Sequence, residues 1–440
     1  MRIDSLNKKI LHIAIPAIVS NVTVPLLGLV DTGIAGHLGR ASYIGAIAVG
    51  SVIFNTIFWL FSFLRWGTSG LTSQALGRGD SNGVSYTLYR SLVVAMVISV
   101  ALIVLQYPIF WLSTFVIAVD SDVAVYVSHY FYICIWGAVA VQTCYALNGW
   151  FVGMQNSRIP MTVAIVQNLT NIPLSLLFVY GLGMKVEGIA LGTVIAQYIG
   201  LAVALWLLRR QYGRYLIRPE WRVLFVRADL LRFLSVNRDI MLRMVCLLSV
   251  TVWFTSVSAR QGAVVLAANT ILQQLFYFFS FFFDGFANAG EALCGKCWGG
   301  RDLVALKKTV GRVFCWGMLL VVLFTAVYYV AERPLLQMLS DQGGVIACAM
   351  RYFGWLLLVP VCGVQTFVWD GVFIGTTSTR LLLLSMVVAT VVFFASYTLL
   401  FPLWGNDGLW LSFLLYLLGR GVTQTLSYPK LIERCLQKAE

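Results

Sequence analysis

The first long apolar stretch of the chain contains an aspartate. Asp31 follows Leu29 and Val30 and precedes Ile34, in the second half of a stretch from 10 to 37. An ionised carboxylate surrounded by hydrocarbon is costly, so this group must be neutral, paired or facing water. A carboxyl group in such a place can take up and release a proton or bind a cation, which is the role we favour. The alternative is an aspartate that only hydrogen-bonds a neighbouring helix.

A second polar group lies on one face of a later apolar stretch. Asn168, Asn171 and Ser175 follow one another at spacings of three and four, which places them on the same side of a helix. Their side chains would complete a hydrogen-bond network with Asp31 if the two helices are neighbours. We therefore assign all four residues to a candidate cation-coupling site. Hydrogen bonds that only hold helices together explain the same pattern equally well.

The densest polar pattern covers the stretch from 264 to 298. Its members share one side of a helix and extend over 22 positions, or ~33 Å, most of the thickness of a bilayer. A helix that faces lipid does not tolerate such a stripe, which therefore predicts a cavity or an interface. The stripe consists of Asn269, Gln273, Tyr277, Ser280, Asp284, Asn288 and Glu291. All of them except Ser280, together with Asp370 of a later stretch, are assigned to a candidate substrate cavity.

Two prolines interrupt the stretch that holds Asp31. Pro16 and Pro25 each remove a backbone hydrogen bond from the predicted helix and make bending easier. We therefore expect both prolines to act as conformational hinges.

The composition shows what kind of elements must position these residues. Hydrophobic residues make up 60% of the 440 residues and charged residues only 11%, far from the roughly one-quarter charge of soluble domains. At ~20 residues a span, the chain holds about a dozen membrane helices and leaves no room for a soluble catalytic or nucleotide-binding domain. Cys294 and Cys297 have no second such pair and no nearby histidine, so we expect no metal site and no cofactor.

The apolar stretches predict an all-α polytopic membrane protein with twelve transmembrane helices. Several stretches are long enough to require tilted helices or helices that extend beyond the bilayer. The predicted spans are 10–37, 43–76, 84–107, 122–154, 159–182, 187–208, 239–260, 264–298, 304–331, 345–376, 379–402 and 408–430.

The two halves of the chain repeat each other at an offset of 222 residues. The pairs Phe54/Phe276, Gly77/Gly299, Asp80/Asp302, Arg90/Arg312, Gly149/Gly371, Gly153/Gly375 and Arg158/Arg380 all share this register. Because each half has an even number of spans, both enter the membrane from the same side and form parallel repeats. The sequence therefore predicts two pseudo-symmetric six-helix lobes at 1–212 and 239–440, joined by a basic linker at 213–238, with the substrate cavity between the lobes.

The net charge of +13 reflects membrane topology rather than nucleic-acid binding. With the N-terminus inside, 24 of the 31 Lys and Arg residues fall on the cytoplasmic side of the predicted spans. We expect a monomer in the cell inner membrane with both termini cytoplasmic, small-molecule substrates and no nucleic-acid partner. The linker could also contact anionic headgroups of membrane lipids.

Several motifs together resemble one family of transporters. They are Asn21-Val-Thr-Val-Pro-Leu-Leu-Gly-Leu-Val-Asp31-Thr, Gly70-Leu-Thr-Ser-Gln-Ala-Leu-Gly77, Asn237-Arg-Asp-Ile-Met-Leu-Arg243, Asp284-Gly-Phe-Ala, Gly290-Glu-Ala-Leu-Cys-Gly295 and Asp370-Gly-Val-Phe-Ile-Gly375. In this order, over nearly the whole chain, they resemble the multidrug and toxic compound extrusion (MATE) transporters, in particular the branch of DNA-damage-inducible protein F.

This resemblance implies a secondary active exporter, not an enzyme. It implies antiport of bulky, often cationic organic compounds by alternating access, coupled to protons or sodium ions. By family likeness Asp31 is the coupling carboxylate and Asn171 belongs to its polar network. Relatives commonly carry a second aspartate where this chain has Ser175. The missing carboxylate favours protons over sodium.

Three other functions fit the sequence less well. A flippase for lipid-linked oligosaccharides, from the same wider superfamily, would need a strongly basic cavity. Only Arg65 and Arg420, however, lie deep within a predicted span, ten or more residues from either end. A membrane transferase would need a catalytic cluster, whereas the three histidines, His12, His37 and His129, are scattered. A passive channel would not need two long repeated halves whose helices are broken by proline and glycine.

Overall fold

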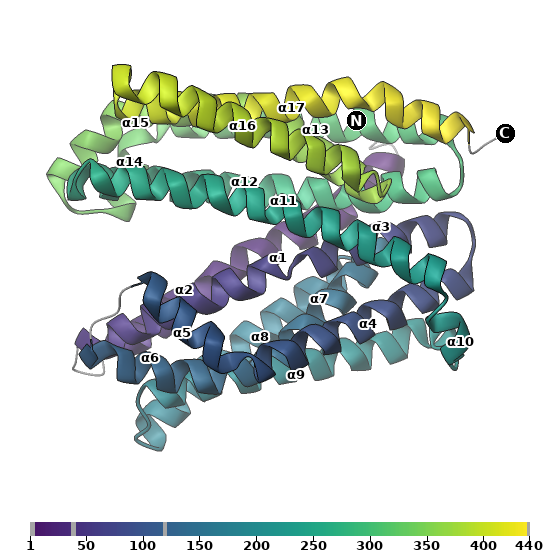
Figure 1. Cartoon of the computed structure of the whole chain (residues 1–440), viewed down its shortest axis with the longest axis horizontal. Helices are drawn as coiled ribbons and strands as arrows, with labels where there is room; N and C mark the ends of the chain where they lie inside the picture. The colour runs from purple at the N-terminus through teal and green to yellow at the C-terminus, as the bar shows by residue number, and fades with distance from the viewer. Residues whose placement is uncertain (1–4, 37–40, 118–120, 438–440) are drawn as a thin grey trace. The chain divides into compact units, whose positions relative to one another are not determined.

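The protein is built from helices. The computed structural model describes residues 5–36, 41–117 and 121–437, and every regular element in these ranges is helical (Figure 1). Long apolar sequences favour this outcome, because a membrane helix satisfies all its backbone hydrogen bonds internally.

The N-terminal half supplies the first six predicted spans. The second, fourth and fifth spans are each formed by consecutive helical segments. The elements are α1 (Ser5–Gly36), α2 (Ala41–Leu60), α3 (Phe63–Gly77), α4 (Ser81–Val104), α5 (Gln106–Ile117), α6 (Ser121–Cys134), η1 (Ile135–Gly137), α7 (Ala138–Gly153), α8 (Arg158–Leu176), η2 (Leu177–Gly181) and α9 (Val186–Tyr212).

The C-terminal half supplies the other six predicted spans. Two short segments, η3 (Gly213–Tyr215) and α10 (Trp221–Leu224), lie in the linker. The helices that follow are α11 (Arg227–Arg260), α12 (Ala263–Gly299), α13 (Leu303–Val330), α14 (Glu332–Leu339), α15 (Gly343–Gly375), α16 (Thr379–Trp404) and α17 (Asn406–Gln437). Among the described residues, ten segments are long and apolar enough to cross a membrane. The first and the last of the twelve predicted spans fall in the long helices α1 and α17.

Each half also contains a short helix where the sequence predicts a connection between spans. These are α5 and α14, which end at equivalent positions of the repeat, Ile117 and Leu339. Pro108 and Pro334 are the third residues of the two helices. Proline fits the first turn of a helix, where its missing N–H needs no partner, but it cannot continue the helix before it.

Glycines show that the two repeats pack in the same way. A Cβ atom at Gly149 would lie 2.2 Å from the carbonyl oxygen of Arg65, and one at Gly371 would lie 2.2 Å from that of Ala287. Positions 65 and 287 differ by the same 222 residues as 149 and 371. Only glycine permits helix backbones to approach this closely, so the fourth span of each half packs on the second in an identical register.

The repeated aspartates have a local role. Asp80 accepts a hydrogen bond from the backbone N–H of Gly83 at 2.7 Å, and Asp302 accepts one from Ala305 at 2.9 Å. Both carboxylates cap the first turn of a helix, α4 and α13, whose N–H groups have no partner within the helix. The two aspartates therefore recur because each half needs a helix cap at this position, and not because they form a binding site.

The packing forms two compact units. One comprises Met1–Ile18, Gly77–Gly79 and Ser235–Glu440, and the other comprises Val19–Leu76 and Asp80–Leu234. In the first unit α12 packs along α15 and α16 along α17; in the second α8 packs along α9 and α4 along α7 (Figure 1). The boundary crosses α1 and α11, so the first helix of each half contributes residues to both units. The lobe boundaries predicted from the sequence remain a prediction.

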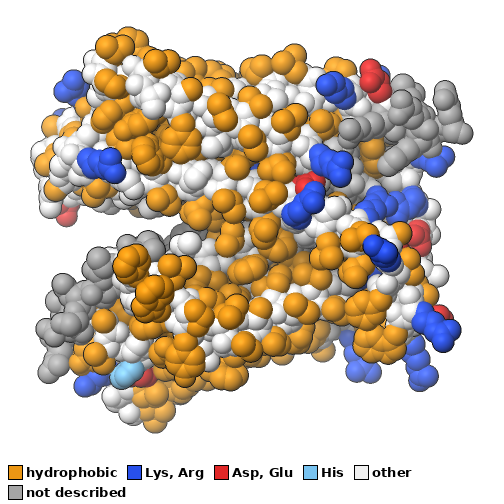
Figure 2. Space-filling model, viewed as in Figure 1, with side chains coloured by type: hydrophobic (Ala, Val, Ile, Leu, Met, Phe, Trp, Pro, Cys, Tyr) orange, Lys and Arg blue, Asp and Glu red, His pale blue; other side chains and the backbone are white. Residues whose placement is uncertain are grey.

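The surface of each unit is mainly apolar. Figure 2 shows hydrophobic side chains along the helices, while most visible Lys and Arg side chains gather toward helix ends. Exposed large side chains include Val97 and Val100 in α4 and Val322 and Leu323 in α13. An apolar band with charged ends is the surface expected of a multi-pass membrane protein.

Candidate functional site

The buried carboxyl group of Asp31 is held by a chain of hydrogen bonds from two other helices. Asp31 in α1 is 3% exposed, and Thr193 Oγ1 of α9 donates a hydrogen bond to its Oδ2 at 3.3 Å. Thr193 Oγ1 also lies 3.0 Å from the carbonyl oxygen of Ile189, which competes for the same hydroxyl hydrogen. Asn171 Nδ2 of α8 donates to Thr193 Oγ1 at 2.9 Å. Asp31 and Asn171 therefore belong to one network, joined through Thr193.

Three oxygen atoms of this region have no hydrogen-bond partner among the described residues. They are Asp31 Oδ1, Asn171 Oδ1 and Ser175 Oγ, and all three residues are buried. Ser175 meets α9 closely, because a Cβ at Gly192 would lie 2.6 Å from its Oγ. Buried polar atoms almost always have a partner. Unpartnered acceptors around a carboxyl group are the atoms that a proton or a small cation would engage.

Asn168 has a different partner. Its Nδ2 donates to the backbone carbonyl oxygen of Thr23 at 2.7 Å, which ties α8 to α1. Thr23 lies eight residues before Asp31, or ~12 Å along the helix. Asn168 thus holds α1 in place beside α8, and no hydrogen bond between described residues links it to the Asp31 network.

Thr193 is a residue of this network that was not predicted from the sequence. In α9 it follows Gly192 and precedes Gln197 by one helical turn, within an otherwise apolar segment. The spacing argument that selected Asn168 and Asn171 applies equally to Thr193 and Gln197, which lie on one face of α9. Its hydroxyl is the central link of the network, because it contacts both the carboxyl group and the amide.

Apolar side chains surround the network in the same unit. Ile34 of α1, Tyr130 and Cys134 of α6, and Ile189 and Val194 of α9 belong to one buried cluster. Such an environment excludes water and strengthens electrostatic interactions. The charge of Asp31 therefore interacts more strongly with its hydrogen-bond partners than it would in water.

The polar stripe of α12 divides into half-buried and buried members. Gln273, Tyr277 and Asp284 are half-buried, whereas Asn288 and Glu291 are buried near the other end of the helix. The adjacent face of α12 packs Phe279 and Phe283 against Phe367 of α15. These rings lie beside the stripe, whose assignment to a substrate cavity stays a prediction.

Asn269, the first residue of the stripe, is fully engaged within its unit. Its Nδ2 donates to Ser258 Oγ and to Asn406 Oδ1, both at 2.7 Å. Asn406 Nδ2 and Trp410 Nε1 donate back to Asn269 Oδ1 at 3.0 and 2.9 Å. The reciprocal amide pair holds α12 against α17, and the hydrogen bond to Ser258 holds it against α11, which is a structural role.

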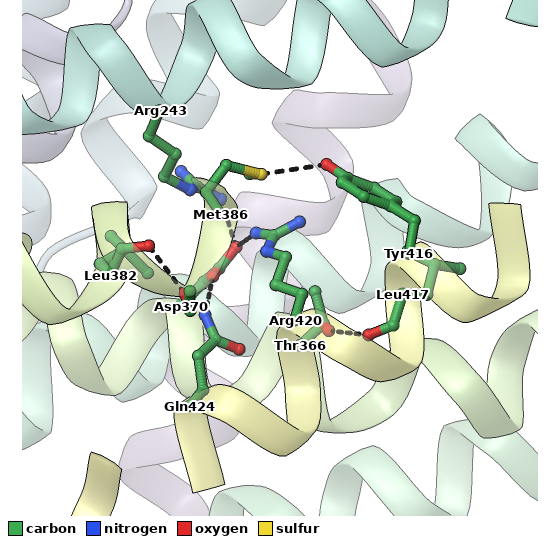
Figure 3. A network of polar contacts seen from close by, with 10 residues as sticks. Arg243, Thr366, Asp370, Leu382, Met386, Tyr416, Leu417, Arg420 and Gln424 are labelled. Carbon is green, nitrogen blue, oxygen red and sulfur yellow. Dashed lines mark hydrogen bonds and ion pairs between the residues drawn. The ribbon is translucent and has the colours of Figure 1, made fainter. Parts of the chain in front are cut away.

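Asp370 lies in a buried ionic cluster (Figure 3). Arg243 of α11 and Arg420 of α17 both donate to its Oδ2, and Gln424 Nε2 donates to its Oδ1 at 2.8 Å. Arg243, Arg420 and Gln424 are each no more than 5% exposed. Asp284 of α12 adds a further electrostatic attraction on Arg243.

Both oxygens of Asp370 are thus occupied by protein donors. The carboxylate binds arginines from two other helices, and its assignment to the substrate cavity stays a prediction. Arg243 and Gln424 were not predicted from the sequence as partners of Asp370. A lone arginine within a membrane span requires a buried acceptor, and this requirement, applied to Arg420, points to a carboxylate on a neighbouring span.

The predicted hinges fall in a continuous helix. Helix α1 runs through both prolines without a break in its helical assignment. Pro16 is buried, and the boundary between the compact units crosses α1 just after it, between Ile18 and Val19. The side chain of Pro25 lies outside the described residues. The hinge role of both prolines remains a prediction.

The fold and its two repeated halves match one family of membrane transporters. A family model named MatE matches residues 16–177 and 240–398, which is more than half of the chain. The chain therefore belongs to the MatE family, as its motifs indicated.

Individual relatives support the same conclusion. The chain is 36% identical over 422 residues to DNA damage-inducible protein F of Escherichia coli, covering 96% of this chain and 92% of that protein. It is 25% identical over 389 residues to the probable multidrug resistance protein NorM of Photorhabdus laumondii, covering 85% and 83%. A solved structure described as the outward-facing conformation of a multidrug resistance MATE family transporter has a TM-score of 0.85 at 17% identity, covering 99% and 97%. This likeness confirms the predicted all-helical, two-lobe fold.

Proposed function

We propose that this protein is a secondary exporter that expels bulky organic compounds, often cationic, in exchange for protons. Membership of the MatE family and relatives named for multidrug resistance support multidrug efflux. The observation that carries the coupling step is the buried Asp31 carboxyl group, hydrogen-bonded through Thr193 to Asn171. The relatives' names give no support to a lipid-linked oligosaccharide flippase.

Proton uptake at Asp31 would change the network in a defined way. The ionised carboxylate accepts the hydroxyl hydrogen of Thr193. A protonated carboxyl group becomes a donor, and Asn171 Oδ1 and Ser175 Oγ are oxygens of the same region that lack a partner. Proton binding therefore favours a different contact between α1 and α8. Such a two-state contact can bias alternating access, with cargo released in one state and the site reset by proton release in the other.

The ligand set favours a proton over sodium. Asp31 is the one carboxylate in the network formed by the described residues, while Asn171, Ser175 and Thr193 contribute neutral groups. A sodium ion in a buried site needs several oxygens with compensating negative charge, because an unpaired buried charge is costly. A proton needs only the carboxylate and a hydrogen-bond acceptor. We further propose that the protein acts as a monomer in the inner membrane with both termini in the cytoplasm.

Gradient-driven efflux tests this proposal. Purified protein is reconstituted into vesicles loaded with a permanently charged cationic dye, and the outside is then made acidic. We expect dye to leave several-fold faster than from protein-free vesicles, because inward proton movement drives export. An inward sodium gradient at equal pH should produce no such acceleration. Efflux driven by sodium alone would contradict proton coupling, and no efflux under either gradient for a range of dyes would contradict the exporter function.

A further inference from the structure

The short helix α10 is fixed firmly to the unit that contains α4. Leu224 at its end is 2% exposed, and Arg90 of α4 donates to the backbone carbonyl oxygens of Val223 and Leu224, both at 3.0 Å. Upstream, the hydroxyl of Tyr89 donates to the carbonyl oxygen of Ile217 at 2.6 Å. The linker between α9 and α11 is therefore an ordered segment. Its inner side is packed against the unit, and its outer side is exposed.

The outer side presents a pair of aromatic rings. Trp221 is 68% exposed and Phe225 is 48% exposed, and their rings stack with centroids 6.1 Å apart and planes 8° from parallel. The next residue, Val226, is also exposed. Exposed, ordered aromatic side chains of this kind are typical of surfaces that meet another apolar phase.

Basic side chains surround these rings. The exposed arginines between 209 and 232 are Arg209, Arg210, Arg214, Arg218, Arg222, Arg227 and Arg232. The acidic residues of the same segment are Glu220 and Asp229, and Asp229 is paired with Arg90 at 2.9 Å. The segment thus has a large excess of positive charge beside an apolar patch.

We propose that this surface, defined by Trp221, Phe225, Arg218, Arg222 and Arg227, binds the anionic headgroups of membrane phospholipids. The segment joins two membrane helices, which places it at the edge of the bilayer. An amphipathic surface with aromatic and basic side chains lies at the boundary between headgroups and acyl chains. Guanidinium groups form charge-assisted hydrogen bonds with phosphate oxygens, and juxtamembrane arginines favour anionic lipids.

Native mass spectrometry of the full chain tests this proposal directly. The protein in detergent is incubated with equimolar phosphatidylglycerol and phosphatidylcholine, and the retained lipids are counted. We expect phosphatidylglycerol to be retained preferentially. The triple variant R218Q/R222Q/R227Q should bind it about tenfold more weakly or worse, because three surface arginines are lost. The charge-matched control K307Q/R380Q/K430Q removes exposed basic residues elsewhere and should retain the lipid as the wild type does.

Two further arms separate the alternatives. Trp221→Ser leaves all arginines in place and should also weaken retention of phosphatidylglycerol, because the apolar contact is lost. Inorganic phosphate at millimolar concentration should not displace the lipid. Equal retention of the two lipids by the wild type, equal losses in the two triple variants, or displacement by free phosphate would each overturn the proposal. Because lipid retention is measured without transport, a failure here is distinct from a failure of the exporter function.

Discussion

Asp31→Asn protein should fold and insert normally but lose gradient-driven efflux. The amide keeps an oxygen that accepts the hydrogen bond from Thr193, and it is less costly to bury than a carboxylate. It cannot take up or release a proton, so the network is fixed in one state. Under an imposed proton gradient we expect dye efflux to fall more than about tenfold, to the rate of protein-free vesicles.

Asp341→Asn provides the matched control. Asp341 is exposed in the connection before α15, so Asp341→Asn makes the same chemical change outside the network. It should leave the efflux rate unchanged. Size-exclusion profiles and thermal unfolding in detergent establish that both variants are folded. Efflux by folded Asp31→Asn protein at the wild-type rate would show that Asp31 is structural.

Asp370→Ala should strongly destabilise the protein. The change leaves the guanidinium groups of Arg243 and Arg420 buried without the carboxylate that both now contact. Removing one partner of a buried ionic cluster costs roughly 3–5 kcal/mol, because an uncompensated charge remains in the interior. Thermal or denaturant unfolding in detergent should show a loss of this size.

A second variant distinguishes charge imbalance from lost packing. Replacing the whole cluster, in R243M/D370L/R420M, removes all three charges and should recover much of the stability lost in Asp370→Ala. For Asp341→Ala, a change at an exposed position, the free energy of unfolding should stay within about 0.5 kcal/mol of the wild-type value. If the Asp370→Ala protein is as stable as the wild type, the buried ionic cluster does not hold α11, α15 and α17 together.

The fold could be predicted from the sequence because its determinants are local or periodic. Apolar length alone gave the twelve spans, and the 222-residue offset placed Gly149 and Gly371 at equivalent contacts. Asp80 and Asp302 cap their helices within three residues, so their meaning needs no tertiary information. The break between α2 and α3 was not predicted, because hydrophobicity continues through it. The short helices α5 and α14 were not predicted, because each lies between two predicted spans and is too short to cross a membrane.

The candidate site could be predicted only in part, because its partners lie on other helices. The polar faces of α1 and α8 revealed Asp31 and Asn171, whereas the link between them, Thr193, is one hydroxyl in an apolar segment of α9. Arg243 likewise meets Asp370 across 127 positions of the chain. Helical periodicity identifies the face on which a residue lies but does not identify the helix that the face contacts. Asn269 shows the same limit, since its partners on α17 were not foreseen.

Proton movement triggered by cargo is the most direct test of the central claim. Proteoliposomes that contain a trapped pH indicator, with no imposed ion gradient, receive a permanently charged quaternary ammonium cargo on the outside. Because antiport exchanges entering cargo for leaving protons, the interior should become alkaline with wild-type protein and stay unchanged with Asp31→Asn. Cargo uptake by the wild type without a change in internal pH, or an equal change with Asp31→Asn, would contradict proton-coupled export through the Asp31 network.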